Sequence, residues 1–294
     1  MIVNLAEVQR AFPRLANVSP LGSGGGGQKF VFRASAAGQS VVLKVLRSAG
    51  TSPGAAVAAQ RADREVLASA TLNSAYVPKV LDTGECEIAG QKRTYIIEEF
   101  VDGRTLRELL MAKPVRDREE VCEILRTLLL AADDFAHANL VHRDIKPENL
   151  MLGSDGRLWI IDFGLVRFLD LDSLTADAAV VGVGTWGYAA PEQQGNRKDE
   201  IDIRADLFSI GVVAFEMLAG ANPYLQNKRD ILAVLLHVRN QDLPMLPYTD
   251  EPGRLLAEFV AIMVGRFASR RPQTAAQAIV WFAPVYQRVT GKTW

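Results

Sequence analysis

The chain has 294 residues, 49% hydrophobic and 23% charged, which is the composition of an ordinary globular protein and excludes a disordered or collagen-like chain. Its 33 basic and 34 acidic residues leave a formal net charge of −1, which excludes attraction of nucleic acid or anionic membranes by the overall field. The length fits one large domain or two coupled lobes.

The N-terminal part of the chain predicts a small lobe rich in strands. The spacing of hydrophobic residues over 1–20 predicts a short amphipathic helix. After a glycine cluster, alternating hydrophobic residues predict strands, and an Ala-, Arg- and Glu-rich stretch predicts one helix over 56–72. The strands are predicted over residues 30–34, 40–46, 77–81, 86–88 and 94–100.

After Gly103 the hydrophobic pattern becomes helical. The sequence therefore predicts an α+β fold, with a small strand-rich lobe and a large, mainly helical lobe. The helices of the large lobe are predicted over residues 106–111, 119–137, 204–219, 231–238, 255–267 and 274–286. The predicted parts are an N-terminal helical extension over 1–20, the small lobe over 21–99, a hinge over 100–103 and the large lobe over 104–294.

The glycine cluster has the pattern G-x-G-x-x-G at Gly22, Gly24 and Gly27. Glycines allow positive φ and bring backbone N–H groups close to phosphate oxygens. A Walker A loop needs lysine directly after the last glycine, where Gln28 stands, and a dinucleotide fingerprint leads into a helix rather than a strand. Two interpretations remain: a glycine hairpin folded over a nucleotide, or a plain surface turn.

A lysine and then a glutamate follow the glycine cluster along the chain. Lys44 ends an apolar strand, and Glu65 on the next predicted helix is a charge partner that would hold it toward phosphates. Taken alone, Lys44 also fits a solvated strand end.

The most specific segment, residues 142–149, has the pattern H-R-D-x-K-x-x-N. Within it, Asp144 and Asn149 can orient a hydroxyl nucleophile and hold a metal, and Lys146 can neutralise a transferring phosphoryl group. A strand predicted over 159–161 leads to Asp162 of D-F-G, whose carboxylate is a suitable oxygen ligand for Mg²⁺.

These motifs, followed by Ala-Pro-Glu at residues 190–192, stand in the order found in protein kinases. The chain resembles the eukaryotic-type Ser/Thr protein kinases, including the Hanks-type kinases of bacteria, over residues 21–271. The resemblance implies the two-lobed protein-kinase fold in a standalone kinase domain, with a small antiparallel-sheet N-lobe that carries one key helix and a large, mainly α-helical C-lobe. It also implies ATP and Mg²⁺ as cofactors and γ-phosphoryl transfer to Ser/Thr hydroxyls of proteins, including autophosphorylation.

The resemblance implies a role for each catalytic residue. Asp144 would accept the proton of the substrate hydroxyl and Lys146 would contact the γ-phosphate. Asn149 and Asp162 would hold Mg²⁺. The lysine at position 146 is typical of Ser/Thr rather than Tyr specificity.

The resemblance also implies a nucleotide site. Lys44, paired with Glu65, would hold the α- and β-phosphates, and the backbone of the hinge would bond adenine. The implied nucleotide-binding residues are Gly22, Gly24, Gly27, Val31, Val42, Lys44, Glu99, Val101 and Met151.

Further positions match structural parts of the family. Asp206 resembles the helix aspartate that anchors the catalytic loop, and Thr185 matches the threonine near the catalytic aspartate. Glu192 and Arg271 resemble the ion pair that ties the activation segment to the large lobe.

Regulation is inferred from Arg143, because an arginine beside the catalytic aspartate is typical of kinases whose activation loop is ordered by phosphorylation. Thr175 is the hypothesised phosphosite. The acidic residues around it would otherwise supply negative charge without modification.

Four departures from the family pattern leave alternatives open. The glycine loop is about two residues longer, which shifts its valine to Val31, and Val42 replaces the usual alanine over adenine. Glu98 occupies the gatekeeper position, where its carboxylate is either costly to bury or meets the adenine amino edge. Ser69 replaces an apolar residue, so a regulatory protein is a possible partner.

The alternatives to an active kinase are an ATP-binding pseudokinase and a small-molecule phosphotransferase, the latter disfavoured by the D-F-G to A-P-E segment.

Location and redox state are predicted from what the sequence lacks. The N-terminus has no signal-peptide pattern, and the most apolar stretch, residues 207–218, is too short to span a membrane. We therefore expect a cytoplasmic protein with protein substrates and neither nucleic-acid nor membrane partners. Cys86 and Cys122 predict buried apolar residues rather than a disulfide framework.

Overall fold

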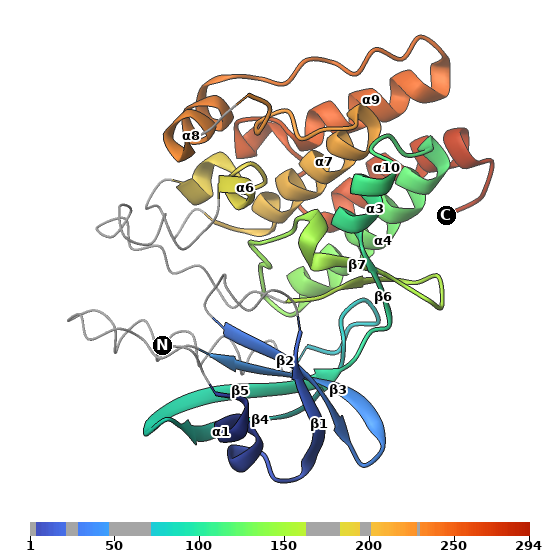
Figure 1. Ribbon diagram of the computed structural model, residues 1–294. Coiled ribbons are helices and arrows are strands. Elements are labelled where there is room, and N and C mark those ends of the chain that lie inside the picture. The colour runs from blue at the N-terminus through green and yellow to red at the C-terminus, as the bar shows by residue number, and fades with distance from the viewer. Residues whose placement is uncertain (1–3, 22–28, 47–71, 163–182, 195–200, 228–229) are drawn as a thin grey trace. The chain divides into compact units, whose positions relative to one another are not determined.

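The computed structural model describes residues 4–21, 29–46, 72–162, 183–194, 201–227 and 230–294. The chain divides into two compact units (Figure 1). The smaller unit contains Val77–Asp102 and the described residues up to Asn73, and the larger contains Ser74–Tyr76 and the described residues from Gly103 onward.

The smaller unit is built on a five-stranded antiparallel sheet in the order β1-β2-β3-β5-β4. Two-residue turns, Ala37-Gly38 and Ala89-Gly90, join β2 to β3 and β4 to β5. All four turn residues have positive φ, between 49° and 85°, as type I′ hairpin turns require. The strands are β1 Leu15–Pro20, β2 Lys29–Ala36, β3 Gln39–Leu46, β4 Val80–Ile88 and β5 Gln91–Glu99.

The helix α1, Leu5–Ala11, closes the hydrophobic core on one face of this sheet (Figure 1). Val8 and Phe12 belong to one buried cluster with Leu43 of the central strand β3. The Phe12 ring meets the edge of Tyr95 on β5 with ring centroids 4.9 Å apart. The N-terminal helix therefore stabilises the sheet itself.

The prediction of a helical extension over residues 1–20 is wrong for residues 15–20, which form β1. The pairing of β1 with β2 shifts register between Ala16 and Ser19, and Asn17 there has a φ of 54°. This bulge turns Leu15 and Val18, three residues apart, to the same buried face. A spacing of three residues imitates a helix, which explains the error.

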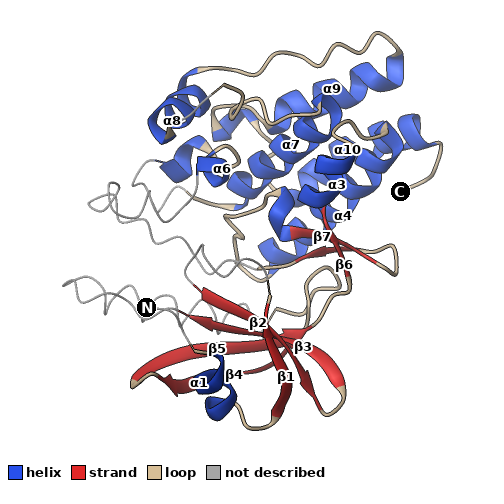
Figure 2. Cartoon of the chain, viewed as in Figure 1, coloured by secondary structure: helices blue, strands red, loops and turns tan. Residues whose placement is uncertain are grey.

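The larger unit is mainly helical, and the fold as a whole is α+β, as predicted (Figure 2). A small antiparallel sheet contains β6 Gly103–Thr105, β7 Leu150–Gly153 and β8 Leu158–Ile160. The α-helices are α3 Leu106–Ala112, α4 Arg118–His137, α6 Val183–Trp186, α7 Ile203–Ala219, α8 Ile231–Asn240, α9 Glu251–Met263 and α10 Ala275–Thr290. Short 3₁₀ helices are η1 Pro147–Asn149, η3 Pro191–Gln194 and η5 Ala268–Arg270.

The helix α7 forms the centre of the larger unit, because nearly all its residues are buried. It packs against α4 and α9, and α10 covers α4 and α9. A Cβ atom on Gly211 would lie only 2.7 Å from the Cβ of Met263, so glycine permits the close approach of α7 and α9.

All six helices predicted for the larger unit are present, with ends shifted by a few residues. The largest shift is in α9, predicted over 255–267. Asp250 caps this helix by accepting the N–H of Gly253, and Pro252 stands in its first turn, so it begins at Glu251. The predicted strands 77–81 and 86–88 contribute to the single strand β4. The helix predicted over 56–72 lies outside the described residues.

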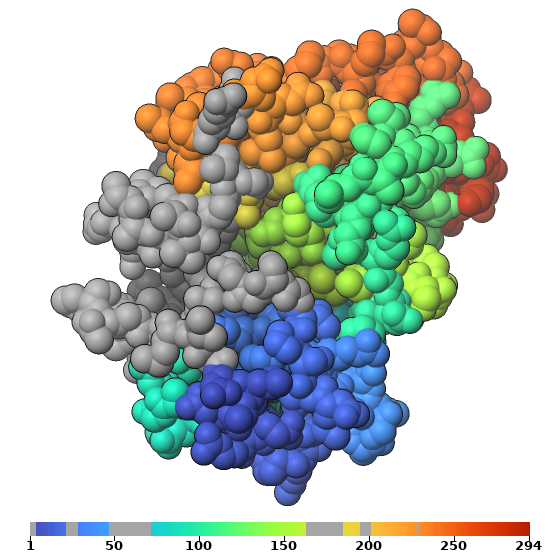
Figure 3. All heavy atoms as spheres, in the orientation of Figure 1, coloured from blue at the N-terminus to red at the C-terminus, as the bar shows by residue number. Residues whose placement is uncertain are grey.

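The C-terminal residues lie against α4, as the red and green atoms of Figure 3 show. Lys292 Nζ lies 2.6 Å from Glu123 of α4, and the Trp294 ring lies over the Arg126 guanidinium. Both cysteines are free, and Cys122 is buried. Among the described residues, no helix has the length and apolar character needed to cross a bilayer.

Candidate active site

The loop that precedes η1 is anchored to α7 by Asp206. The two carboxylate oxygens of Asp206 accept the backbone N–H groups of His142 and Arg143, each at 2.7 Å. Asp206 is fully buried, and burial raises its pKa to about 7 although the two N–H donors favour its charged form. Arg143 has a φ of 65°, a strained conformation that these bonds and its neighbours hold.

The carboxylate of Asp144 is fixed from two sides. Lys146 Nζ donates to its two oxygens at 2.8 and 3.1 Å. Asn149 Nδ2 donates to Asp144 Oδ2 at 3.0 Å and to its backbone oxygen at 2.8 Å. Lys146 also donates to Thr185 Oγ1 at 3.2 Å, which connects the loop to the segment before Ala-Pro-Glu.

The hairpin of β7 and β8 brings Asp162 to the same loop. The backbone N–H of Ile161 donates to the backbone oxygen of Asn149 at 2.9 Å. The residue before Asp162 therefore lies against Asn149. Asp162 has a φ of 62°. Since Asn149 uses its amide nitrogen on Asp144, its Oδ1 is the atom available to a cation.

The oxygen ligands of Asn149 and Asp162 fit a magnesium site. Within the part of the chain that the structure describes, no group of three or more His, Cys, Asp or Glu could hold a metal by itself. Mg²⁺ usually binds one or two protein oxygen ligands and completes its shell with phosphates and waters. The amide oxygen of Asn149 and the carboxylate of Asp162, which follows Ile161 in the chain, match that pattern.

The segment around Ala-Pro-Glu is bonded to the loop that carries Asp144 and to the helices of the larger unit. Gln193 donates from Nε2 to the Arg143 oxygen and accepts the Ala190 N–H at Oε1, both at 3.0 Å. Glu192 forms a two-pronged ion pair with Arg271 at 2.6 and 3.0 Å. The Arg271 side chain is fully buried, so this pair fixes the segment on the core of the larger unit.

The smaller unit gathers its predicted site residues on the face of β3 that does not carry Leu43. Val31 of β2 stands opposite Lys44, and Val42 stands opposite Glu98 of β5. Lys44 Nζ and Glu98 Oε1 form an ion pair, and the two residues are 4% and 9% exposed. The Glu98 carboxylate, at the position expected to be the gatekeeper, is therefore buried and paired with a cation within the sheet.

The remaining nucleotide-site candidates lie on both units. Glu99 donates its N–H to the Lys79 oxygen at 3.0 Å and accepts the Lys79 N–H at Oε2, and Val101 is half-buried. Met151 lies on β7, opposite Trp159 of β8. The candidates outside the described residues are Gly22, Gly24, Gly27, Glu65, Ser69 and Thr175.

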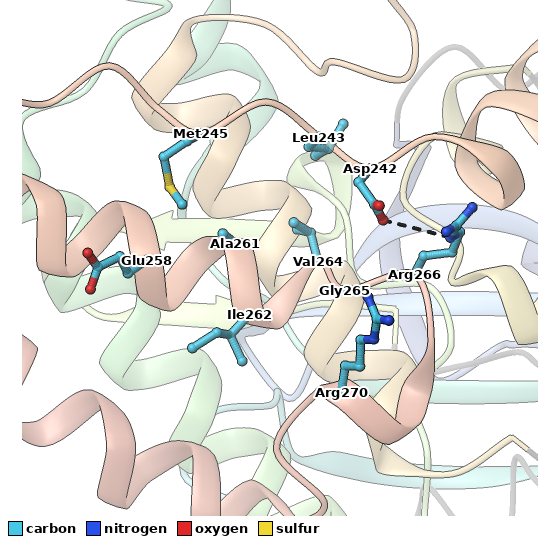
Figure 4. A pocket seen from close by; sticks show the side chains of 10 residues that line it. All are labelled: Asp242, Leu243, Met245, Glu258, Ala261, Ile262, Val264, Gly265, Arg266 and Arg270. Atoms are coloured by element: carbon cyan, nitrogen blue, oxygen red, sulfur yellow. Dashed lines mark ion pairs between the residues drawn. The ribbon is translucent and has the colours of Figure 1, made fainter.

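A separate pocket of about 370 Å³ lies on the larger unit between α9 and the segment before it (Figure 4). Apolar side chains such as Met245 and Ile262 line it, and Asp242 pairs with Arg266 at its rim at 3.7 Å. None of the catalytic candidates lines this pocket, so it is not part of the candidate active site.

Comparison with known families identifies the chain. The sequence profile of the protein kinase domain matches residues 15–279, nearly the whole chain. The chain belongs to the protein kinase domain family. Membership in this family accounts for the order of the motifs around Asp144 and Asp162, and it implies the use of ATP, a divalent metal and protein substrates in general terms.

Similar curated proteins are bacterial Ser/Thr kinases. This kinase domain is 33% identical to the serine/threonine-protein kinase PknB of Mycobacterium leprae over 216 residues, 73% of this chain and 34% of that protein. It is 34% identical to PknB of Mycobacterium tuberculosis over 220 residues, 73% of this chain and 34% of that protein. A probable serine/threonine-protein kinase of Streptomyces coelicolor is 33% identical over 232 residues, 79% of this chain and 33% of that protein. The kinase domain spans about one third of the length of these relatives.

Two groups of contacts in the kinase domain were not predicted from the sequence. The Lys44–Glu98 pair crosses from β3 to β5, and only strand pairing in the right register would have placed the two side chains on one face. Arg107 of α3 contacts three acidic or phenolic side chains distant in sequence. No local motif signals that cluster.

Proposed function

We propose that this protein kinase domain transfers the γ-phosphoryl group of ATP to Ser or Thr hydroxyls of protein substrates, including its own chain. The observation that supports this function is the geometry of Asp144, whose carboxylate is held by Lys146 and Asn149 while Lys146 also contacts Thr185. A fixed carboxylate, a fixed ammonium group and an oxygen ligand on one loop are the parts that phosphoryl transfer needs.

Asp144 accepts the proton of the attacking hydroxyl and orients its oxygen toward phosphorus. Lys146, which in the free protein donates to Asp144, supplies positive charge beside the transferring group. Because Asn149 restrains both the carboxylate and the backbone of Asp144, little reorganisation is needed when the substrate binds.

ATP and Mg²⁺ are the cofactors of this proposal. Asn149 Oδ1 and the Asp162 carboxylate would hold the metal. When bound, Mg²⁺ neutralises charge on the phosphate oxygens and fixes their orientation.

The proposed nucleotide contacts of the smaller unit centre on Lys44, whose ammonium would meet the α- and β-phosphates. The ammonium is buried and forms an ion pair with the Glu98 carboxylate, which compensates its charge within a largely apolar face. The other proposed contacts are Gly22, Gly24, Gly27, Val31, Val42, Glu65, Glu99, Val101 and Met151.

Other proposals rest on the sequence alone. These are a hinge over residues 100–103, an activation-loop phosphosite at Thr175 read by Arg143, a regulatory protein partner and a cytoplasmic location. Each of them stays a prediction.

The test is transfer of label from γ-³²P-ATP with Mg²⁺ to the protein itself and to casein, followed by acid hydrolysis. Phosphoserine or phosphothreonine made by the wild type and by Asp155→Asn, an exposed carboxylate in the β7–β8 turn, but not by Asp144→Asn is the expected result. ATP binding without transfer would favour the pseudokinase, and label found only in a sugar or small molecule would overturn protein phosphorylation.

A further inference from the structure

Arg107, at the start of α3, joins three parts of the larger unit through one guanidinium group. Its Nε donates to Glu148 of η1 at 2.7 Å, its Nη1 to Glu216 of α7 at 2.7 Å, and its Nη2 to the Tyr188 hydroxyl at 2.5 Å. The Tyr188 hydroxyl in turn donates to the second oxygen of Glu216. We call these four residues the Arg107 clamp.

The Arg107 guanidinium is the cation of the clamp, and it faces two carboxylates and one neutral hydroxyl. Although burial opposes its charge, the bonds and charges of Glu216, Tyr188 and Glu148 raise the pKa of Arg107 above its ordinary value. Burial and the Glu216 carboxylate raise the pKa of Tyr188 well above its ordinary value, so its hydroxyl keeps the proton that it donates. One cation therefore compensates one buried and one half-exposed carboxylate.

The first route from the clamp to the catalytic carboxylate runs through η1. Glu148 immediately precedes Asn149, which donates to both the carboxylate and the backbone oxygen of Asp144. Holding the Glu148 side chain against α3 therefore restrains the short helix that positions Asn149.

The second route runs through the segment before Ala-Pro-Glu. The Tyr188 backbone N–H donates to the backbone oxygen of Thr185 at 3.1 Å, and the Thr185 hydroxyl accepts a hydrogen bond from Lys146 Nζ. The Tyr188 oxygen also accepts from Ser209 of α7 at 2.8 Å. Both routes end at the group that the proposed function assigns as the base.

We propose that Arg107 is a positioning residue for phosphoryl transfer, one that fixes η1 and the segment carrying Tyr188 relative to α7. The proposal rests on the proposed function, because its effect is on the placement of Asp144 and Asn149. A forked guanidinium is needed for this, since a lysine ammonium cannot reach Glu148, Glu216 and Tyr188 together.

The first experiment measures transfer kinetics to casein for Arg107→Lys and Glu148→Ala. Arg107→Lys keeps the charge beside Glu216, and the Glu148 side chain is half-exposed, so both variants should fold. The expected result is a kcat about tenfold lower in each, with the KM for ATP unchanged, because a small misplacement of reacting groups costs rate rather than binding. The double variant should be no slower than either single one.

The matched control is Arg118→Lys, which alters an arginine ion pair to Asp250 at the N-terminus of α9. Its kcat should stay within about twofold of the wild type. If Arg107→Lys and Glu148→Ala also stay within twofold of a wild type that transfers phosphate, Arg107 is structural only and the inference is overturned.

The second experiment does not depend on activity. Hydrogen–deuterium exchange in the free protein should be faster over residues 144–150 and 185–190 in Arg107→Lys and Glu148→Ala, and unchanged in Arg118→Lys. Unchanged exchange in both clamp variants would overturn the inference. If exchange rises but the wild type transfers no phosphate, the clamp stands as a positioning device and the proposed function alone has failed.

Discussion

Arg271 is an almost fully buried charge of the larger unit, and its removal should be costly. Its guanidinium donates to Glu192 through two bonds and to the backbone oxygens of Gly265, Arg204 and Arg266 at 2.7, 2.8 and 3.3 Å. In Arg271→Met the Glu192 carboxylate, only 10% exposed, loses this partner. Removing one partner of a buried pair costs about 3–5 kcal/mol. Against a total stability of about 5–15 kcal/mol, such a loss is a large fraction.

Urea unfolding, followed by the fluorescence of the buried Trp186 and by circular dichroism, measures this free energy. Arg288→Met is the control, because it removes an exposed ion pair to Glu251 and should cost less than about 1 kcal/mol. The double variant Arg271→Met with Glu192→Gln should lose less than the sum of the two single variants, because no uncompensated carboxylate remains. A loss below about 1 kcal/mol in Arg271→Met would refute the reasoning.

Three further predictions concern stability. Glu98→Leu should lower the free energy of unfolding in urea by about 2–4 kcal/mol, because it leaves the buried Lys44 ammonium with one fewer carboxylate. The control Glu85→Leu, which removes an exposed ion pair, should lower it by less than about 0.5 kcal/mol. Equal losses in the two variants would contradict this reasoning. Gly211→Val should lower the free energy of unfolding by about 2 kcal/mol or more, since its side chain would collide with α9, and a neutral effect would argue against the close packing. The pKa of Asp206 is raised to about 7 from 3.8, so the folded state binds more protons than the unfolded state between pH 4 and 7. The free energy of unfolding of the wild type, relative to Asp206→Asn, should therefore fall as pH rises through that range. A difference that does not change with pH would contradict the raised pKa.

Local patterns predicted most of the fold. The helices of the larger unit follow from the hydrophobic period of the sequence, although that period placed the start of α9 four residues too late. The strand β1 was missed because its bulge at Asn17 gives Leu15 and Val18 a helical spacing. That spacing reflects pairing with β2, which is not a local property of residues 15–20.

The candidate site was predictable where its residues share one short segment. The segment 142–149 carries Asp144, Lys146 and Asn149 in fixed order, so their proximity follows from the chain itself. The Arg107 clamp was not predictable, because its partners lie 41, 81 and 109 residues away and meet only through the tertiary packing of the larger unit. The same holds for Lys44 and Glu98, which meet through the register of β3 and β5.

The pairing of Glu98 also changes how the gatekeeper departure is understood. The sequence suggested either a costly buried carboxylate or one that meets the adenine amino edge. In the structure the carboxylate contacts Lys44, so the glutamate is compensated within the smaller unit. The departure is therefore compatible with a folded and active kinase domain.

The central claim is that Asp144 acts in the chemical step. It is tested most directly by single-turnover transfer from γ-³²P-ATP to casein, combined with equilibrium binding of ATP, for the wild type and Asp144→Asn. The account predicts that Asp144→Asn transfers phosphate at least about a hundredfold more slowly, the range expected for loss of a positioned base, while its Kd for ATP stays within about twofold. Equal transfer rates, or a loss of ATP binding that accounts for the slower transfer, would contradict it.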